Sequence, residues 1–226
     1  MIKPYYEDEW STIYCGDCID ILPNLEPVGA IITDPVWPNN SLKEFEGIDP
    51  YKTLETAAIH WPKLCKRAVI QLGCNSDPRI LSAIPPELPF IRVNWLRYRP
   101  AYRGRILIGS DVAYSFGEPP PSRKYHRLIS GECDIPKGKD ATLMGGEYKR
   151  SKIGHPCPRL LQHVRYLVDK FSVPEEIILD PFMGSGVTVR AAKDLGRKSI
   201  GIEIKEKYCE IAVQQLKQEI LDFNNQ

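Results

Sequence analysis

A glycine-rich turn is the strongest local signal for chemistry in this sequence. The segment D-P-F-M-G-S-G-V-T, residues 180–188, lies between an expected strand, 176–179, and an expected helix, 187–195. Glycines in a strand–turn–helix unit let the backbone approach a nucleoside closely at the carboxyl edge of a sheet. Glu203 ends the next expected strand, where its carboxylate can accept both ribose hydroxyls of an adenosine.

The glycine pattern argues against the common phosphate-binding turns. A dinucleotide turn needs a third glycine three residues after Gly186, where Val189 stands, and no Walker lysine follows. A nicotinamide-dependent oxidoreductase therefore has little support. The Asp180 carboxylate would repel a pyrophosphate and would suit a cationic ligand that carries adenosine. S-adenosylmethionine has that character.

A second turn follows the apolar run 29–33, which is typical of a buried parallel strand. Its residues are Asp34-Pro35-Val36-Trp37-Pro38. An Asp-Pro pair after a strand often does no more than start a turn. The presence of the glycine-rich turn elsewhere in the chain makes a functional reading the stronger one.

These segments resemble motifs of the amino-group DNA methyltransferases. Residues 180–188 resemble the family's D-P-F-x-G-S-G-T-T motif, with Val187 in place of the usual threonine. Residues 34–37 resemble its [D/S/N]-P-P-[Y/F/W] tetrapeptide, with Val36 in place of the second proline. The G-D-C segment, 16–18, resembles one that opens many of these enzymes, and residues 155–160 match the H-P-T-Q-K-P motif more loosely, with Arg159 in place of lysine.

The resemblance implies methyl transfer from S-adenosylmethionine to the exocyclic amino group of a base. The Asp34 carboxylate and the Pro35 carbonyl would hold both amino hydrogens and localise the nitrogen lone pair. Trp37 would stack on the base after it leaves the helix. Because Val36 cannot fix φ as proline does, the departure bears on catalytic efficiency more than on identity. No cysteine nucleophile is needed.

The same resemblance assigns cofactor contacts. In the family, the glycine-rich segment binds the methionine part and the adenosine, and the aspartate of G-D-C lies near the adenine. Asp17 could equally be the N-cap of a helix, and both roles can hold together. The expected cofactor-binding residues are Asp17, Cys18, His155, Asp180, Phe182, Gly184, Ser185, Gly186, Thr188 and Glu203.

Alternating strands and helices must position these turns. Strands are expected at 11–14, 29–33, 68–72, 91–98, 112–116, 176–179 and 199–204, and helices at 18–22, 51–65, 159–171, 187–195 and 207–221. This pattern predicts a single α/β domain over 1–226, with a Rossmann-like, mainly parallel sheet. The catalytic turn precedes the cofactor turn, an order that resembles the family's β group. The proline-interrupted region 75–154 is expected to be an inserted, loop-rich recognition segment.

A basic and aromatic stretch, 92–105, could contact DNA phosphates and stack on bases. A solvated strand edge with surface loops is the alternative. With the catalytic turn nearby, DNA contact is favoured. The predicted DNA-binding residues are Arg97, Arg99, Arg103, Arg105, Arg123 and Lys124.

Composition limits the remaining classes. The 226 residues are 42% hydrophobic and 26% charged, with a net charge of +1, so DNA affinity must come from a local basic patch. No long apolar run or signal core is present, and the 7 scattered cysteines fit reduced thiols, which predicts a cytoplasmic location in a bacterial or phage-infected cell. Cys15 and Cys18 lack a second pair, and the histidines lack metal spacing, so no metal is expected.

Adenine N6 is the favoured target because Asp34 opens the tetrapeptide, whereas serine is commoner there in cytosine-N4 enzymes. Cytosine N4 is therefore the runner-up. A nucleic-acid-binding member with a degenerate, inactive site is the alternative from another class, motivated by Val36 and the altered 155–160 segment. RNA as substrate, a homodimer and a partner restriction nuclease all stay open.

Overall fold

The computed structural model describes residues 2–39, 46–73, 76–103, 105–119, 132–133, 135 and 159–217. In these ranges nine strands form one sheet in the order β1-β2-β9-β8-β3-β4-β6-β5-β7. The strands are β1 (Tyr6–Glu7), β2 (Ser11–Cys15), β3 (Val28–Thr33), β4 (Cys65–Leu72), β5 (Phe90–Arg103), β6 (Ile106–Gly117), β7 (Glu132–Cys133), β8 (Ile178–Asp180) and β9 (Ser199–Glu203).

The helices connect these strands. They are α1 (Cys18–Ile21), α2 (Pro50–Ala58), α3 (Trp61–Leu64), α4 (Leu161–Phe171), α5 (Val187–Asp194) and α6 (Glu206–Lys217), with short 3-10 turns η1 (Leu22–Asn24) and η3 (Pro78–Ala83). The expected helix 207–221 is described only as far as Lys217.

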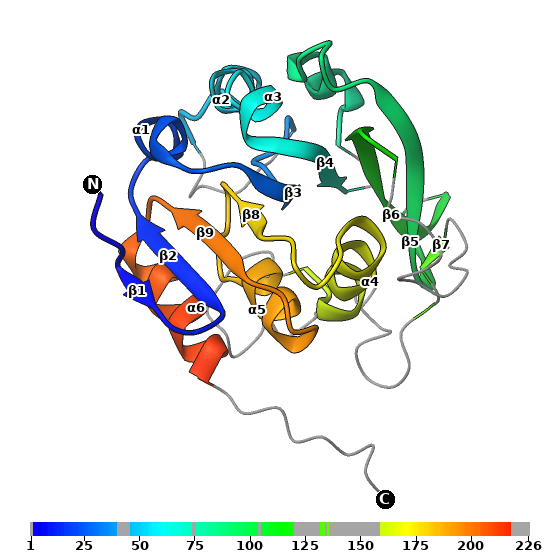
Figure 1. Cartoon of the computed structure of the whole chain (residues 1–226). Coiled ribbons are helices and arrows are strands. Elements are labelled where there is room, and N and C mark those ends of the chain that lie inside the picture. Colours follow the sequence, from blue (N-terminus) through cyan, green and yellow to red (C-terminus); the bar gives the residue numbers. More distant parts are fainter. Residues whose placement is uncertain are drawn as a thin grey trace, which may run out of the picture.

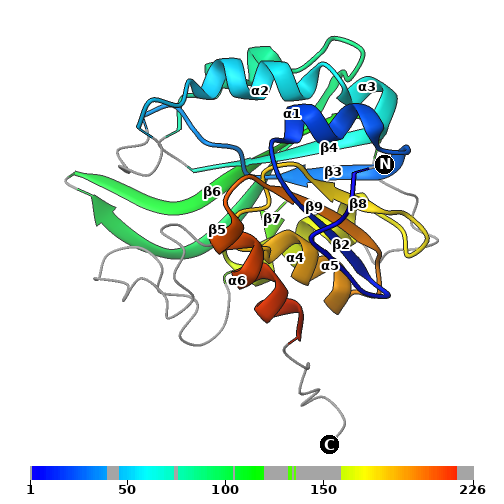
Figure 2. The same ribbon diagram turned by 90° about the vertical axis from the view of Figure 1, so that its left-hand side faces the viewer.

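The centre of the sheet is parallel. Strands β2, β9, β8, β3 and β4 pair in parallel, while β6 pairs antiparallel with both β4 and β5. Figures 1 and 2 show helices α1, α2 and α3 on one face of this sheet and α4, α5 and α6 on the other. The predicted Rossmann-like, mostly parallel α/β architecture is confirmed.

Apolar side chains on both faces explain the layers. All six residues of β3 are buried, as a strand covered on both sides requires. Its Ile31 packs with Leu54 and Trp61 of the α2–α3 layer. Its Ile32 belongs to the cluster with Val164 and Ala191 of α4 and α5. Neighbouring residues of one strand therefore anchor opposite helical layers.

The expected helix over 51–65 was wrong in its length, because the chain forms two helices there. α2 ends at Ala58, α3 starts at Trp61, and Cys65 already belongs to β4. Pro62 lies in the first turn of α3. A proline inside one continuous helix would remove a hydrogen bond and clash with the preceding turn, whereas the first turn accepts it.

The described part of the region 75–154, residues 76–103, 105–119, 132–133 and 135, differs from the loop-rich segment that was expected. Strands β5 and β6 run well beyond the predicted 91–98 and 112–116 and pair as a long antiparallel hairpin that extends the central sheet. The register shifts between Arg97 and Ala101, where Pro100 stands. An irregularity of this kind lets a strand continue through a proline, which cannot donate to the ladder.

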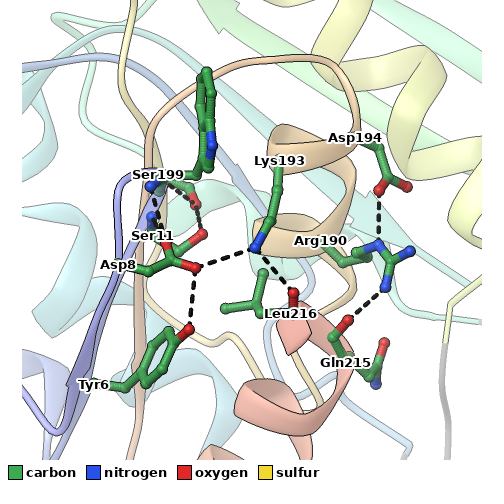
Figure 3. Close-up of polar contacts among 10 residues, drawn as sticks. Tyr6, Asp8, Ser11, Arg190, Lys193, Asp194, Ser199, Gln215 and Leu216 are labelled. Atoms are coloured by element: carbon green, nitrogen blue, oxygen red, sulfur yellow. Dashed lines mark hydrogen bonds and ion pairs between the residues drawn. The ribbon is translucent and has the colours of Figure 1, made fainter. Parts of the chain in front are cut away.

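Polar contacts fasten the N-terminal strands to the last two helices (Figure 3). Lys193 of α5 donates to the Asp8 carboxylate at 3.1 Å and to the Leu216 carbonyl of α6 at 2.9 Å. Arg190 of α5 pairs with Asp194 and donates to the Gln215 carbonyl. These contacts fix the positions of α5 and α6 relative to each other and to the N-terminal strands.

Among the described residues, no helix is both long and apolar enough to cross a bilayer. The same residues contain no group of three or more His, Cys, Asp or Glu side chains that could hold a metal ion. Cys15 is exposed, Cys18 is buried, and both are free thiols.

Candidate active site

A cavity of about 380 Å³ opens at the carboxyl ends of the parallel strands. The residues that follow β2, β3, β8 and β9 all contribute to its wall. The crevice beyond the carboxyl ends of the strands is where open α/β sheets bind ligands. Of the residues predicted from the sequence, those that line it are Asp17, Cys18, Asp34, Pro35, Trp37, Asp180, Phe182, Gly184, Ser185, Thr188 and Glu203.

Asp180 ends β8 and organises the glycine-rich turn. Its Oδ1 accepts hydrogen bonds from the Thr33 hydroxyl at 2.6 Å and from the Phe182 backbone N–H at 3.1 Å. Burial raises the pKa of Asp180 to about 6, although the hydrogen bonds that it accepts act in the opposite direction. A carboxylate buried beside an empty volume favours a cationic ligand.

Two glycines of this turn have positive φ. Gly184 has φ +53 and Gly186 has φ +88, a region that side chains rarely adopt. A Cβ on Gly186 would lie 2.5 Å from the Cβ of Ala212 in α6. Gly186 does not line the cavity, so its part in the site is to let the turn pack closely against α6.

Glu203 lies at the end of β9, as the sequence predicted. Its Oε2 accepts a hydrogen bond from the Gly184 N–H at 3.0 Å, and its Oε1 accepts one from the Lys205 N–H at 2.8 Å. Burial raises its pKa. Each oxygen keeps a second lone pair, so the carboxylate can still accept two hydroxyl groups.

Asp17 takes the N-cap position of α1, because its Oδ1 accepts a hydrogen bond from the Ile19 N–H at 3.0 Å. It also lines the cavity. The two roles that the sequence left open for this residue are therefore compatible. Beside it, burial raises the pKa of the Cys18 thiol to about 12, so this wall of the cavity carries an uncharged thiol.

The Asp34 carboxylate is engaged on both oxygens. Trp37 Nε1 donates to Oδ1 at 2.7 Å. Arg159 binds in a bidentate manner, with Nη2 donating to Oδ1 at 2.7 Å and Nε donating to Oδ2 at 2.6 Å. The Arg159 guanidinium also lies 4.3 Å from the centre of the Trp37 ring. Asp34 and Trp37 of the turn and their partner Arg159 thus form one compact unit at the cavity wall.

Two neighbours hold that unit in place. Arg159 donates a third hydrogen bond, from Nη1 to Asp111 Oδ2 of β6, at 2.9 Å. The edge of the Trp37 ring packs against Gly73, where a Cβ would lie 3.1 Å from the ring. Arg159 was noticed in the sequence only as the basic residue of the loosely matching 155–160 motif. Its partnership with Asp34 and Asp111 could not be read from spacing.

Gln71 of β4 is a cavity residue that sequence reasoning missed. It is only 3% exposed, it lines the cavity, and its Nε2 has no hydrogen-bond partner within the described parts of the chain. A polar residue within the otherwise apolar run 68–72 was the signal that could have identified it. Strands buried on both faces rarely carry an amide without a polar partner.

Four of the five predicted DNA-binding arginines lie on the β5–β6 hairpin, and Arg97, Arg99 and Arg105 do not line the cavity. Arg97 and Arg99 of β5 and Arg105 at the hairpin turn are exposed. Arg103 lies on β5 by its backbone. Arg123, Lys124 and the predicted cofactor residue His155 lie outside the described residues.

Comparison with known proteins gives three kinds of match. A family model described as "DNA methylase", for N6 and N4 methyltransferases, matches residues 139–214. The type II methyltransferase M.HinfI of Haemophilus influenzae is 47% identical over 96% of this chain and 71% of its own length. The type II methyltransferase M.ScaI of Streptomyces caespitosus is 28% identical over 96% of this chain and 84% of its own length.

Solved structures share the fold. The M1.HpyAVI–SAM complex aligns with a TM-score of 0.67 at 24% identity, over 91% of this chain and 99% of that one. The cytosine-N4-specific PvuII DNA methyltransferase aligns with a TM-score of 0.72 at 17% identity, over 99% of this chain and 91% of that one. Given its similarity to M.HinfI over nearly the whole sequence, the chain belongs to the amino-group (N6-adenine and N4-cytosine) DNA methyltransferases, a family of S-adenosylmethionine-dependent enzymes.

Proposed function

We propose that this chain transfers a methyl group from S-adenosylmethionine to the N6 amino group of adenine in DNA. The observation that carries the proposal is the shared cavity, in which the Asp34 turn and the glycine-rich turn face one volume. Cytosine N4 is the second candidate, because the chain shares its fold with a cytosine-N4-specific enzyme. The Asp34 that opens the tetrapeptide favours adenine by resemblance to the family.

The cavity wall fits the cofactor. About 380 Å³ lies within the range typical of sites for small ligands. Glu203 can accept the two ribose hydroxyls, and the buried Asp180 offers negative charge to a cation. The turn around Gly184 and Ser185 brings backbone rather than bulky side chains to the cavity. S-adenosylmethionine, when bound, supplies an electrophilic methyl group on a sulfonium.

Asp34 and Pro35 would prepare the nucleophile. The lone pair of an exocyclic amino group is delocalised into the ring, so the nitrogen is a weak nucleophile. Two acceptors that hold both amino hydrogens favour a tetrahedral nitrogen, whose lone pair then points toward the methyl group. In the described state, N–H groups of Arg159 and Trp37 already donate to the Asp34 carboxylate. The incoming amino group would take the place of one of these donors.

The β5–β6 hairpin would hold the DNA. Exposed Arg97, Arg99 and Arg105 give it positive charge, and such side chains position DNA by contacting phosphates. The wider region 75–154 would then provide target recognition within one methyltransferase domain spanning 1–226. Because this part of the chain is short, we expect a short or relaxed target sequence.

One experiment tests the function directly. The protein is incubated with unmodified DNA and methyl-labelled S-adenosylmethionine, and the digested nucleosides are separated by mass spectrometry. Label on N6-methyladenine supports the proposal, and label on N4-methylcytosine supports the second candidate. No label in DNA, together with no measurable cofactor binding by calorimetry, would instead favour an inactive nucleic-acid-binding member. A parallel incubation with RNA tests whether RNA is a substrate.

A further inference from the structure

The buried amide of Gln71 is a polar group that the proposed mechanism does not use. Its side chain lines the cavity, and its Nε2 is buried with no hydrogen-bond partner in the ranges that the structure describes. Leaving a buried donor unpaired costs about 1–3 kcal/mol. Such a group in a native cavity calls for a partner, and a bound ligand can supply it.

Sheet register places this amide beside Asp34. Strands β3 and β4 pair in parallel, with Ile32 opposite Val69 and Thr33 opposite Ile70. Asp34 directly follows Thr33 at the end of β3, and Gln71 directly follows Ile70 in β4. Ile32 and Val69 both pack in the cluster beneath α4, and side chains alternate along a strand. Asp34 and Gln71 therefore fall on that same α4 side, where Arg159 reaches Asp34.

The two side chains present complementary chemistry. A carboxylate accepts hydrogen bonds, and the amide Nε2 donates them. In adenine, the exocyclic amino group donates and the adjacent ring nitrogen N1 accepts. Cytosine has the same arrangement, with its ring nitrogen N3. A carboxylate with an amide donor beside it thus matches the edge of an amino-bearing base at two neighbouring atoms.

We propose that Gln71 is a specificity-determining residue that donates a hydrogen bond from Nε2 to the ring nitrogen next to the target amino group. This inference rests on the proposed function and names a second contact to the base. The contact fixes the ring in the plane that directs its amino group at Asp34. It also occupies the lone pair of the ring nitrogen, a competing nucleophile, so that the methyl group goes to the exocyclic nitrogen.

The test compares two bases in two proteins. Wild type and Gln71→Leu are assayed on a duplex with adenine at the methylated position, and on the same duplex with 1-deazaadenine, which keeps the amino group but lacks N1. If label falls on cytosine, 3-deazacytosine replaces it. Wild type should prefer the natural base by roughly tenfold to hundredfold in kcat/KM, and Gln71→Leu should show little preference. Comparing ratios removes effects of the weakened base pair.

Two further readouts do not depend on turnover. Binding of each duplex, measured with S-adenosylhomocysteine present, should show the same loss of preference in the variant. The affinity of Gln71→Leu for S-adenosylmethionine alone should stay within about twofold of wild type. If Gln71→Leu does not fold, Gln71→Met and Gln71→Glu replace it, the latter placing an acceptor where the donor stood.

Asn94 offers a matched control. It is a fully buried amide on β5, one strand beyond β6, and it does not line the cavity. Its Oδ1 has no hydrogen-bond partner among the described residues. Asn94→Leu should keep the wild-type preference between the two bases even where it lowers the melting temperature. A Gln71→Leu enzyme that still distinguishes adenine from its deaza analogue as wild type does would overturn the inference. Absence of methyl transfer by wild type itself would overturn the proposed function instead.

Discussion

Thr33 and Asp180 stand 147 residues apart in the chain, yet the Thr33 hydroxyl donates a 2.6 Å hydrogen bond to the Asp180 carboxylate. Thr33 ends β3, directly before the Asp34 turn, and Asp180 ends neighbouring β8, directly before the glycine-rich turn. The contact ties the two turns together at the rim of the sheet. Trp37 of one turn and Phe182 of the other consequently line the same cavity.

Replacing Asp34 should stop methyl transfer without emptying the cofactor site. Asp34→Ala removes the proposed acceptor for an amino hydrogen, and a lost preorganised polar contact of this kind costs roughly hundredfold or more in kcat. The affinity for S-adenosylmethionine, measured by calorimetry, should change little. Full activity of the variant would refute the assignment.

Asp111→Asn is the matched control for that variant. Asp111 holds Arg159 from the other side and does not line the cavity. Loosening Arg159 while the Asp34 carboxylate stays in place should lower kcat much less than Asp34→Ala does. Equal losses in the two variants would mean that Asp34 acts through the ion pair and not on the base.

The Arg159–Asp34 pair should also be visible in stability. Both side chains are mostly buried, at 10% and 26% exposed, and they form a bidentate contact. Arg159→Met, Asp34→Asn and the double variant form a cycle whose coupling energy in urea unfolding should be about 1–3 kcal/mol. Additive effects, with no coupling above about 0.3 kcal/mol, would show that the pair is not energetically formed.

Cofactor affinity should depend on pH through Asp180. Burial raises the pKa of this carboxyl from 3.8 to about 6, so its ionisation disfavours the empty folded state. That contribution to stability is fully present below about pH 4 and is lost as pH rises through 6. Ionisation favours a cation, so the Kd of S-adenosylmethionine should tighten between pH 5 and 7.5.

S-adenosylhomocysteine, which lacks the sulfonium charge, is the control ligand for this titration. Its affinity should change much less over the same interval. Asp180→Asn should flatten the profile of S-adenosylmethionine toward that of S-adenosylhomocysteine. If the Kd values of the two ligands depended on pH in the same way in wild type, Asp180 would not be the group that recognises the sulfonium charge.

Alanine substitutions at two glycines should distinguish the cost of backbone strain from the cost of close packing. Gly186 (φ +88) and Gly196 (φ +67) both have positive φ, but an added Cβ meets Ala212 only at Gly186 and meets nothing within 4 Å at Gly196. Gly196→Ala should cost about 1–2 kcal/mol of unfolding free energy from φ alone. Gly186→Ala should cost roughly 1–3 kcal/mol more because α5 and α6 are forced apart. Similar losses at both sites, measured by urea unfolding, would contradict the packing role.

The sequence by itself determined most of the central strands and the chemistry of each turn. Short continuous apolar runs predicted the strands around Ile31 and Leu179, because a strand that is buried on both faces needs apolar residues at successive positions. The glycines and the carboxylates Asp34, Asp180 and Glu203 were identifiable because strand ends in parallel sheets converge on one edge. Local chain chemistry suffices for these features.

Only the tertiary structure decided which distant groups meet. Arg159 occupies both oxygens of Asp34, Gln71 lines the cavity, and Gly186 packs against α6, and all three depend on contacts between residues far apart in the chain. The hairpin β5–β6 likewise exceeded its predicted length, because β5 and β6 pair with each other beyond the segment that contacts β4 and so carry β5 through Pro100. Residue type and local motif therefore indicate which chemistry a side chain can perform, and tertiary packing determines which residues it contacts.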